Sequence, residues 1–275
     1  MKVVLLGTAA AEGIPGIFCN CETCQKALKL GGKDYKTRQQ ALIDNILIDF
    51  GADTYMHFLK AGRTLYDIEN VLITHAHFDH FIPEEFYNRA YGMAYNFTSP
   101  KLTFYCNQAV YNRMQSNLDE GLLKNNYNII LVKDYISFEI EGHIITPMPA
   151  IHSSNEESHI YLLEKENKCV LYCLDTGIIK EDKMYNWLKE NNKHIDLIIF
   201  DCTKGAKESN YYTHMSMSEN NYMKEKFISF GICDTKTKYV CTHFSHNCKM
   251  NHCELEDAAK KYGLEIAFDN MEIIV

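Results

Sequence analysis

The sequence predicts a single α/β domain in which two β-sheets pack together and are covered by helices. Short apolar runs typical of strands alternate with amphipathic segments typical of helices along most of the chain. The 275 residues contain no internal repeat, low-complexity tract or Pro/Gly-rich linker that would divide them. A domain of this size can bury roughly three quarters of its unfolded surface. We therefore expect one domain over residues 1–275.

The first expected elements lie before residue 75. The apolar residues 2–6 predict a strand. Residues 40–50 predict a hairpin, because two apolar runs flank the turn pair Asp44-Asn45. Residues 54–62 predict a helix that ends at a glycine, as helices commonly do. Residues 70–74 predict another strand.

The remaining elements follow the same patterns. Further strands are expected at residues 101–106, 128–133, 143–148, 159–163, 169–174, 197–200, 238–241, 264–268 and 272–275. Helices are expected between them at residues 182–191, 218–230 and 254–262. Ser218 is the expected N-cap of the helix that it begins, because a serine hydroxyl can accept a hydrogen bond from a free first-turn amide.

Composition and charge restrict the function. The formal net charge is −8, which weakens nucleic-acid binding as a main role because backbone phosphates require a basic surface. No apolar run approaches the roughly 20 residues of a membrane helix. The apolar start of the chain superficially resembles a secretory signal, but Gly7-Thr8 interrupts it. Eleven cysteines would leave one unpaired in a secreted protein, so we expect a cytoplasmic protein. Monomer and homodimer both stay open.

One segment is rich in metal-ligand side chains. His75, His77, Asp79 and His80 follow the apolar strand residues 71–73 within six positions. Imidazole suits zinc, iron and manganese, and a carboxylate shifts the preference toward harder ions. The first two histidines alternate along an extended segment and can point the same way, whereas the next two ligands diverge toward a neighbouring position. The segment can therefore serve two ions; a solvated histidine-rich loop is the alternative.

Three further candidate ligands also follow apolar strands. His152, Asp175 and His243 each end such a run. Alone, each would more often cap a strand or lie on the surface. Loops at strand ends project side chains into a shared cleft, so their common placement favours metal ligation.

A second kind of metal site is expected near the N-terminus. Cys19, Cys21 and Cys24 place three soft sulfur atoms in a loop at about residues 16–36. Structural zinc usually takes four ligands, so a fourth must come from elsewhere. His246 is the first choice, and a chance cluster of inert cysteines is the alternative to a site. The competing fourth ligands are Cys248, His252 and Cys253.

These motifs resemble the metallo-β-lactamase superfamily, whose His-x-His-x-Asp-His signature matches residues 75–80. The resemblance implies a four-layer αββα sandwich with two metal ions at one edge of the paired sheets. It also implies a hydroxide between ions roughly 3.5–4 Å apart as the nucleophile. The implied ligands are His75, His77 and His152 for one ion, Asp79, His80 and His243 for the other, and Asp175 as a bridge.

Other motifs narrow the resemblance to the PhnP family of phosphoribosyl cyclic phosphate phosphodiesterases of phosphonate breakdown. They are Gly7-Thr8, Gly13-x-Pro15, Cys19-x-Cys21-x-x-Cys24, the run at 242–246 and the run at 268–273. That family implies a structural zinc held by Cys19, Cys21, Cys24 and His246. It also implies a histidine near the substrate phosphate, which here matches His214. This histidine could donate a proton to the leaving alcohol; a surface loop histidine is the alternative.

The sequence thus favours hydrolysis of a small cyclic phosphodiester, with Asp79 and His214 as catalytic residues. The expected cofactors are two divalent ions (zinc or manganese, with iron also open) and one structural zinc. Asp201 is expected either to orient a ligand histidine or to cap a strand. The tyrosine-rich residues 84–133 match no motif and are expected to line the substrate pocket.

Three other functions stay open at this stage. They are tRNA 3′-end processing, thioester or lactone hydrolysis, and a non-enzymatic di-iron redox module. The acidic charge and the absence of a basic, glycine-rich arm weigh against a large RNA partner. The chain length leaves no room for the flavin domain that a redox module would need.

Overall fold

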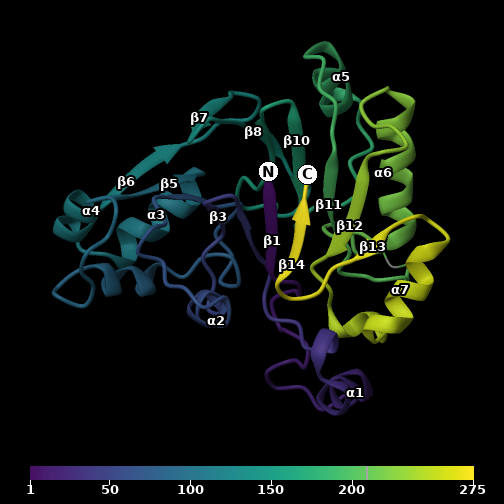
Figure 1. Cartoon of the computed structure of the whole chain (residues 1–275), viewed down its shortest axis with the longest axis horizontal. Coiled ribbons are helices and arrows are strands. Elements are labelled where there is room, and N and C mark those ends of the chain that lie inside the picture. Colours follow the sequence, from purple (N-terminus) through teal and green to yellow (C-terminus); the bar gives the residue numbers. More distant parts are fainter. Residues whose placement is uncertain (209) are drawn as a thin grey trace.

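The computed structural model describes residues 1–208 and 210–275. Across these residues the strands form two seven-stranded sheets (Figure 1). A buried apolar cluster lies between the sheets and takes side chains from both, for example Val3 and Ile43 from the first and Tyr161 and Val170 from the second. Two further apolar clusters lie on the outer faces under the helices. The architecture is the predicted αββα sandwich.

The first sheet combines an antiparallel half with a parallel half. Strands β1, β2 and β14 pair antiparallel, and β3 to β6 run parallel. In spatial order the strands are β14 (Met271–Ile274), β1 (Lys2–Gly7), β2 (Gln40–Ile43), β3 (Ile46–Ile48), β4 (Asn70–Leu72), β5 (Leu102–Cys106) and β6 (Tyr127–Leu131). The predicted hairpin joins β2 to β3, and Asp44 adopts a φ of 50° in its turn.

The second sheet is parallel over its C-terminal strands. Strands β10, β11, β12 and β13 run parallel, so β10, β11 and β12 end at one edge. In spatial order the strands are β13 (Glu265–Ile266), β12 (Lys238–Thr242), β11 (Leu197–Asp201), β10 (Lys168–Cys173), β9 (His159–Lys165), β8 (His143–Pro149) and β7 (Phe138–Ile140). The loops after β10 and β12 carry Asp175 and His243.

Helices cover the two outer faces. On the first sheet lie α2 (Thr54–Lys60), α3 (Gln108–Asn117) and α4 (Glu120–Asn126), and on the second lie α5 (Lys183–Glu190), α6 (Met217–Ser229) and α7 (His252–Lys260). Helix α1 (Glu22–Leu30) and the 3-10 turns η1 (Gly32–Asp34), η2 (Pro83–Arg89) and η3 (His246–Cys248) lie in the connecting loops. Within the described residues, no helix is both long and apolar enough to cross a membrane.

One sequence prediction about helix α6 is wrong. The N-cap is Ser216 and not Ser218. The Ser216 hydroxyl accepts a hydrogen bond from the Glu219 amide, and the Glu219 carboxylate accepts one from the Ser216 amide. This reciprocal capping box satisfies two amides at once, so the helix begins one residue before Ser218.

Candidate metal centre

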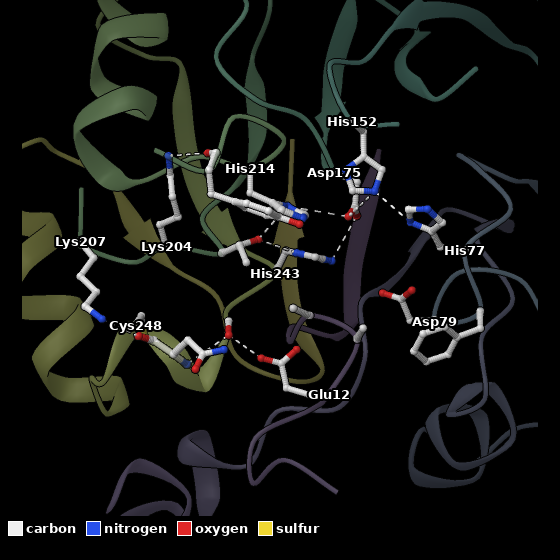
Figure 2. Close-up of a pocket in the computed structure, with 17 residues that line it drawn as sticks. Glu12, His77, Asp79, His152, Asp175, Lys204, Lys207, His214, His243 and Cys248 are labelled. Atoms are coloured by element: carbon white, nitrogen blue, oxygen red, sulfur yellow. Dashed lines mark hydrogen bonds and ion pairs between the residues drawn. The ribbon is translucent and has the colours of Figure 1, made fainter. Parts of the chain in front are cut away.

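The edge of the sandwich brings the predicted ligands together. His75, His77 and His152 form one group, and Asp79, His80 and His243 form another. Within each group the candidate ligand atoms lie within 4.8 Å of one another. Figure 2 places His77, Asp79, His152 and Asp175 on one side of a pocket. The groups meet because the strands that precede these loops end at the same edge of the paired sheets.

In the first group, each ring presents one nitrogen to the others. His77 Nδ1 lies 3.0 Å from His152 Nε2. His75 Nδ1 contacts the Thr74 hydroxyl at 2.9 Å, which leaves its Nε2 facing inward. The outer nitrogen of His77 lies 3.7 Å from a Glu156 carboxylate oxygen. Partners on the outer nitrogens fix the ring orientation, as is usual for histidines that bind metals.

In the second group, buried polar groups fix the two histidines. His80 Nδ1 lies 2.7 Å from Asp49 Oδ2, and its Nε2 lies 3.2 Å from Asp79 Oδ2. His243 Nδ1 lies 2.8 Å from the Thr203 hydroxyl. The Nε2 atom of each ring is therefore the one left for a metal ion.

Asp175 lies between the two groups. Its Oδ2 atom is 3.1 Å from His80 Nε2 and 3.2 Å from His243 Nε2, and its Oδ1 atom is 3.6 Å from His152 Nε2. The residue has a φ of 46°, in the left-handed region that non-glycine residues rarely adopt. Such backbone strain persists where the surroundings over-determine it, commonly at functional sites. The carboxylate can reach both groups at once.

The donor atoms fit metal ions. Within the described residues, four of these buried atoms have no hydrogen-bond partner: Nε2 of His75, His80 and His243, and Oδ2 of Asp175. The 3.1 Å contact between His80 and Asp175 lacks hydrogen-bond geometry. Buried polar atoms without partners are costly and are rare in folded proteins. Five imidazoles and two carboxylates are the donors that zinc, manganese and iron accept.

Protons compete with metal ions for these atoms. Burial lowers the pKa of His80, but Asp175, Asp79 and Asp49 outweigh it and hold that pKa well above its ordinary value. Burial raises the pKa of Asp175, but His243 and His80 hold it well below the ordinary range. Metal binding would therefore displace a proton from His80 and keep Asp175 ionised.

His214 lies beside the two ligand groups but is not one of the predicted metal ligands. Its Nδ1 atom is 2.7 Å from Asp201 Oδ2, and its ring stacks between Tyr211 and His243. Burial lowers its pKa, but Asp201 and then Asp175 outweigh it and raise the pKa to about 9. The side chain is buried, so the alternative of a surface histidine is wrong. Asp201 orients His214 and also bonds to Thr203.

A pocket of about 610 Å³ opens over these residues. Its lining includes Phe78 and Tyr211 as well as four of the histidines. Lys204 and Lys207 lie on the side opposite His77 in this view. The Lys204 ammonium pairs with Glu219 at 2.7 Å, and the Lys207 ammonium donates to the Asn247 carbonyl.

The cysteine cluster meets His246. The Sγ atoms of Cys19, Cys21 and Cys24 and a nitrogen of His246 lie within 4.8 Å of one another. His246 Nδ1 is 3.5 Å from Cys19 Sγ and 3.3 Å from Cys21 Sγ. A backbone hydrogen bond from Cys24 and then His246 lower the pKa of Cys21 to about 6, which favours the thiolate. Three sulfurs and one imidazole are a donor set of structural zinc.

The competing fourth ligands lie outside this group. Cys248 is buried and contacts the Met250 carbonyl. His252 contacts Lys36 and Glu256. Cys253 is exposed. The geometry therefore favours His246 over all three.

Comparison with known families matches residues 39–228 to the family described as anti-Pycsar protein Apyc1. The match covers more than half of the chain and includes the ligand loop at 75–80, His152, Asp175 and His214. The chain belongs to the Apyc1 family. His243 and the four residues of the cysteine–histidine group lie outside the matched range of this Apyc1-family chain.

The fold is that of the metallo-β-lactamase superfamily. A diphosphatase from the PhnP family has a TM-score of 0.76 at 20% identity and covers 100% of this chain and 97% of its own. Zinc-bound PqqB from Methylobacterium extorquens has a TM-score of 0.70 at 16% identity, with both chains fully covered. Human tRNase Z, short form, has a TM-score of 0.64 at 16% identity, covering 100% and 99%. At these low sequence identities, the similarity supports a shared fold and does not by itself assign an activity.

A curated relative matches only in part. An 85-residue segment is 35% identical to part of the octanoyltransferase of Porphyromonas gingivalis. The segment covers 29% of this chain and 16% of that protein. The Apyc1-family chain thus spans a small part of that relative's length.

The expectation for residues 84–133 is wrong. The described residues that line the metal-side pocket of the Apyc1-family chain come from other segments. Residues of 84–133 instead help to line a separate cavity on the outer face of the first sheet. The stretch folds into η2, β5, α3, α4 and β6, and its helical segments pack on that outer face.

Three supporting residues were not predicted. Asp49 directly follows the apolar strand β3, so the criterion that found Asp175 could have found it. Thr203 and Glu156 lie in polar loops and carry no comparable sequence signal. All three contact histidines of the Apyc1-family site.

Proposed function

We propose that this protein is a two-metal hydrolase that opens small cyclic phosphodiesters, a class that includes the cyclic phosphates of ribose and of nucleosides. The observation that carries the proposal is the pair of ligand groups joined by Asp175, with His214 beside them in one pocket. Among proteins of similar structure, a diphosphatase and a tRNase are by name enzymes of phosphate anhydrides or esters.

The proposed ligand sets are those that the sequence resemblance implied. His75, His77 and His152 would hold one divalent ion, Asp79, His80 and His243 the other, and Asp175 would contact both. When bound, such ions lower the pKa of water and stabilise negative charge on phosphoryl oxygens. Zinc, manganese and iron all suit this donor set.

His214 would be the general acid. Its Nδ1–H donates to Asp201, so Nε2 is the atom left to hold the transferable proton. As water adds to phosphorus and gives up a proton, the P–O bond of the ring breaks and the departing alkoxide takes the proton from Nε2. The proton given up by water then restores the charged form of His214. The product is an open phosphomonoester with a free hydroxyl. A pKa of about 9 keeps His214 charged at neutral pH, as this role requires.

The pocket supports a small substrate. Its volume of about 610 Å³ lies within the range of roughly 300–1,000 Å³ typical of small-molecule sites. The exposed rings of Phe78 and Tyr211 offer apolar contact to a sugar or a base. The net charge of −8 gives little attraction for a long polyanion.

We also propose that Cys19, Cys21, Cys24 and His246 hold a structural zinc ion. The group joins the loop before α1 and the first turn of α1 to η3, which follows β12. Glu12 Oε1 lies 3.7 Å from His246 Nε2, the ring nitrogen that does not contact the sulfurs, where it would orient the ligand.

A substrate panel tests the proposed activity. Protein loaded with zinc or with manganese would be assayed against nucleoside and ribose cyclic phosphates, linear phosphodiesters, RNA, a thioester and a lactone. We expect the small cyclic phosphates to have the highest kcat/KM. The Asp175→Ala variant controls for contaminating enzymes. Faster cleavage of RNA or of a thioester would overturn the substrate assignment and leave the metal assignment standing.

A further inference from the structure

A second cavity lies on the outer face of the first sheet, among the residues that pack under α2 and η2. Its volume is about 430 Å³, and none of its described lining residues lines the metal-side pocket. The lining is largely aromatic, with rings contributed by Phe50, Tyr55, Tyr66, Phe86, Tyr95, Phe97 and Tyr127. The volume is that of a small-molecule site.

Hydrogen bonds hold the walls of this cavity in place. The amide and hydroxyl of Thr98 both donate to the Tyr66 carbonyl, at 3.1 and 3.2 Å. The Tyr127 hydroxyl donates to the Phe86 carbonyl. The Phe86 ring in turn packs against Phe50 at 4.8 Å between centroids. Four segments of the chain, around residues 50, 66, 86–98 and 127, are thus tied around one space.

One cation lines the cavity. Within the described residues, the Arg89 guanidinium donates a single hydrogen bond, from Nη2 to the Ser99 carbonyl. It lies 4.3 Å from the centre of the Phe97 ring, and no described carboxylate is within ion-pair distance of it. Glu85 also lines the cavity, but its carboxylate accepts a hydrogen bond from Asn88. A guanidinium has five donors, so Arg89 has capacity for a bidentate acceptor.

We propose that this cavity binds a small aromatic anion, with its ring between the aromatic walls and its acidic group on Arg89. Aromatic rings prefer offset-stacked or edge-on contact with other rings. A carboxylate, sulfonate or phosphate matches the planar fork of the guanidinium. A neutral apolar ligand would leave most Arg89 donors unsatisfied. The cavity is thereby distinct in position and in chemistry from the metal site.

Two fluorescent probes of similar shape test the proposal on the metal-loaded protein. Anilinonaphthalene sulfonate carries the anion, and N-phenylnaphthylamine lacks it. We expect saturable binding of the sulfonate to the wild-type protein. The Arg89→Met variant should raise the Kd of the sulfonate about ten-fold or more, because a charge-assisted contact is lost. It should leave the Kd of the neutral probe within about two-fold.

Arg63→Met is the matched control. Arg63 pairs with Asp67 at 2.8 Å and does not line the cavity, so its loss should leave both Kd values unchanged. If Arg89→Met does not fold, Thr64→Trp at the lining should weaken both probes. The proposal is overturned if the wild-type protein shows no saturable binding of the sulfonate. It is equally overturned if Arg89→Met, or Thr64→Trp in its place, leaves the Kd of the sulfonate unchanged.

Discussion

At the scale of single residues, one carboxylate organises two histidines with different tasks. Asp201 accepts from His214 Nδ1 directly and from the Thr203 hydroxyl at 3.0 Å. Thr203 in turn contacts His243 Nδ1 at 2.8 Å. The buried network thus fixes which nitrogen of each ring faces the pocket. Asp201 is itself held by the Met215 amide, so the proposed general acid and the proposed metal ligand share one rigid support.

His214 and Asp175 should be separable by substrate. His214→Ala should lose about 10²–10⁴-fold in kcat for an alkoxide leaving group, because proton transfer contributes that much. The loss should shrink for bis(p-nitrophenyl) phosphate, whose leaving group needs no proton. Asp175→Ala should abolish turnover of both, because it would disturb both ions. Steady-state kinetics on the two substrates test this prediction. Equal losses of kcat for both substrates in His214→Ala would indicate that His214 positions the phosphate and does not donate a proton.

The pH profile should report the Asp201–His214 pair. Asp201 is the main group that raises the pKa of His214 to about 9. The acid form exists below that pKa, so kcat for an alkoxide substrate should fall as pH rises through about 9. In Asp201→Asn the pKa of His214 should be lower, so the decrease in kcat should occur at lower pH. An unmoved alkaline limb would exclude His214 as the titrating acid.

At the scale of elements, the start of α6 can be tested with paired variants. Ser216 caps the helix and Ser218 does not. Ser216→Ala should lower the free energy of unfolding by about 1 kcal/mol, the usual cost of losing an N-cap side chain. Ser218→Ala should change it by less than about 0.5 kcal/mol. Urea denaturation measures both, and the reverse order would restore Ser218 as the cap.

A glycine beside the ligand loop should control metal binding. A Cβ atom added to Gly51 would lie 2.0 Å from the Asp79 carbonyl oxygen, so the loop must shift. We expect Gly51→Ala to destabilise the protein by about 1–3 kcal/mol and to weaken metal binding. Gly121, in α4, has nothing within 4 Å of its Cβ position, so Gly121→Ala is the control. Calorimetric metal titration should separate them; normal affinity in Gly51→Ala would contradict this account.

Sequence patterns predicted the elements that bury many apolar side chains and missed a helix that buries few. Every predicted strand is present, because short apolar runs in a buried sheet carry a strong signal. Helix α3 was not predicted, since Val110 and Met114 are its two buried residues and make too narrow a stripe. Helix α2 was predicted over 54–62 and ends at Lys60. The following Gly62 has a φ of 69°, so the glycine signal lies beyond the last helical turn.

At the scale of the whole molecule, the two ends of the chain are joined in the first sheet. Strands β1 and β14 pair, and the two termini lie close together (Figure 1). Asp269 accepts hydrogen bonds from the Thr8 hydroxyl and the Thr37 amide. The cysteine–histidine group adds a connection between the segment at 19–24 and His246. Such placement follows from topology, which explains why sequence spacing alone left the fourth ligand of the proposed zinc site open.

Metal should therefore leave the protein in two stages. A chelator should first remove the two active-site ions, with loss of activity and little change in Tm, because that site opens into the pocket. The zinc on Cys19, Cys21 and Cys24 should persist, because thiolate ligation in a closed tetrahedral site is tighter. Later loss of this zinc should lower Tm, because the metal link that closes the long loop between residues 24 and 246 is then broken. Elemental analysis and thermal unfolding would be followed together.

Cys21→Ser should lack this zinc and Cys253→Ser, at an exposed cysteine, should retain it. Finding no metal beyond two ions per chain would contradict a separate zinc site, because the two ligand groups at the pocket would already account for those ions.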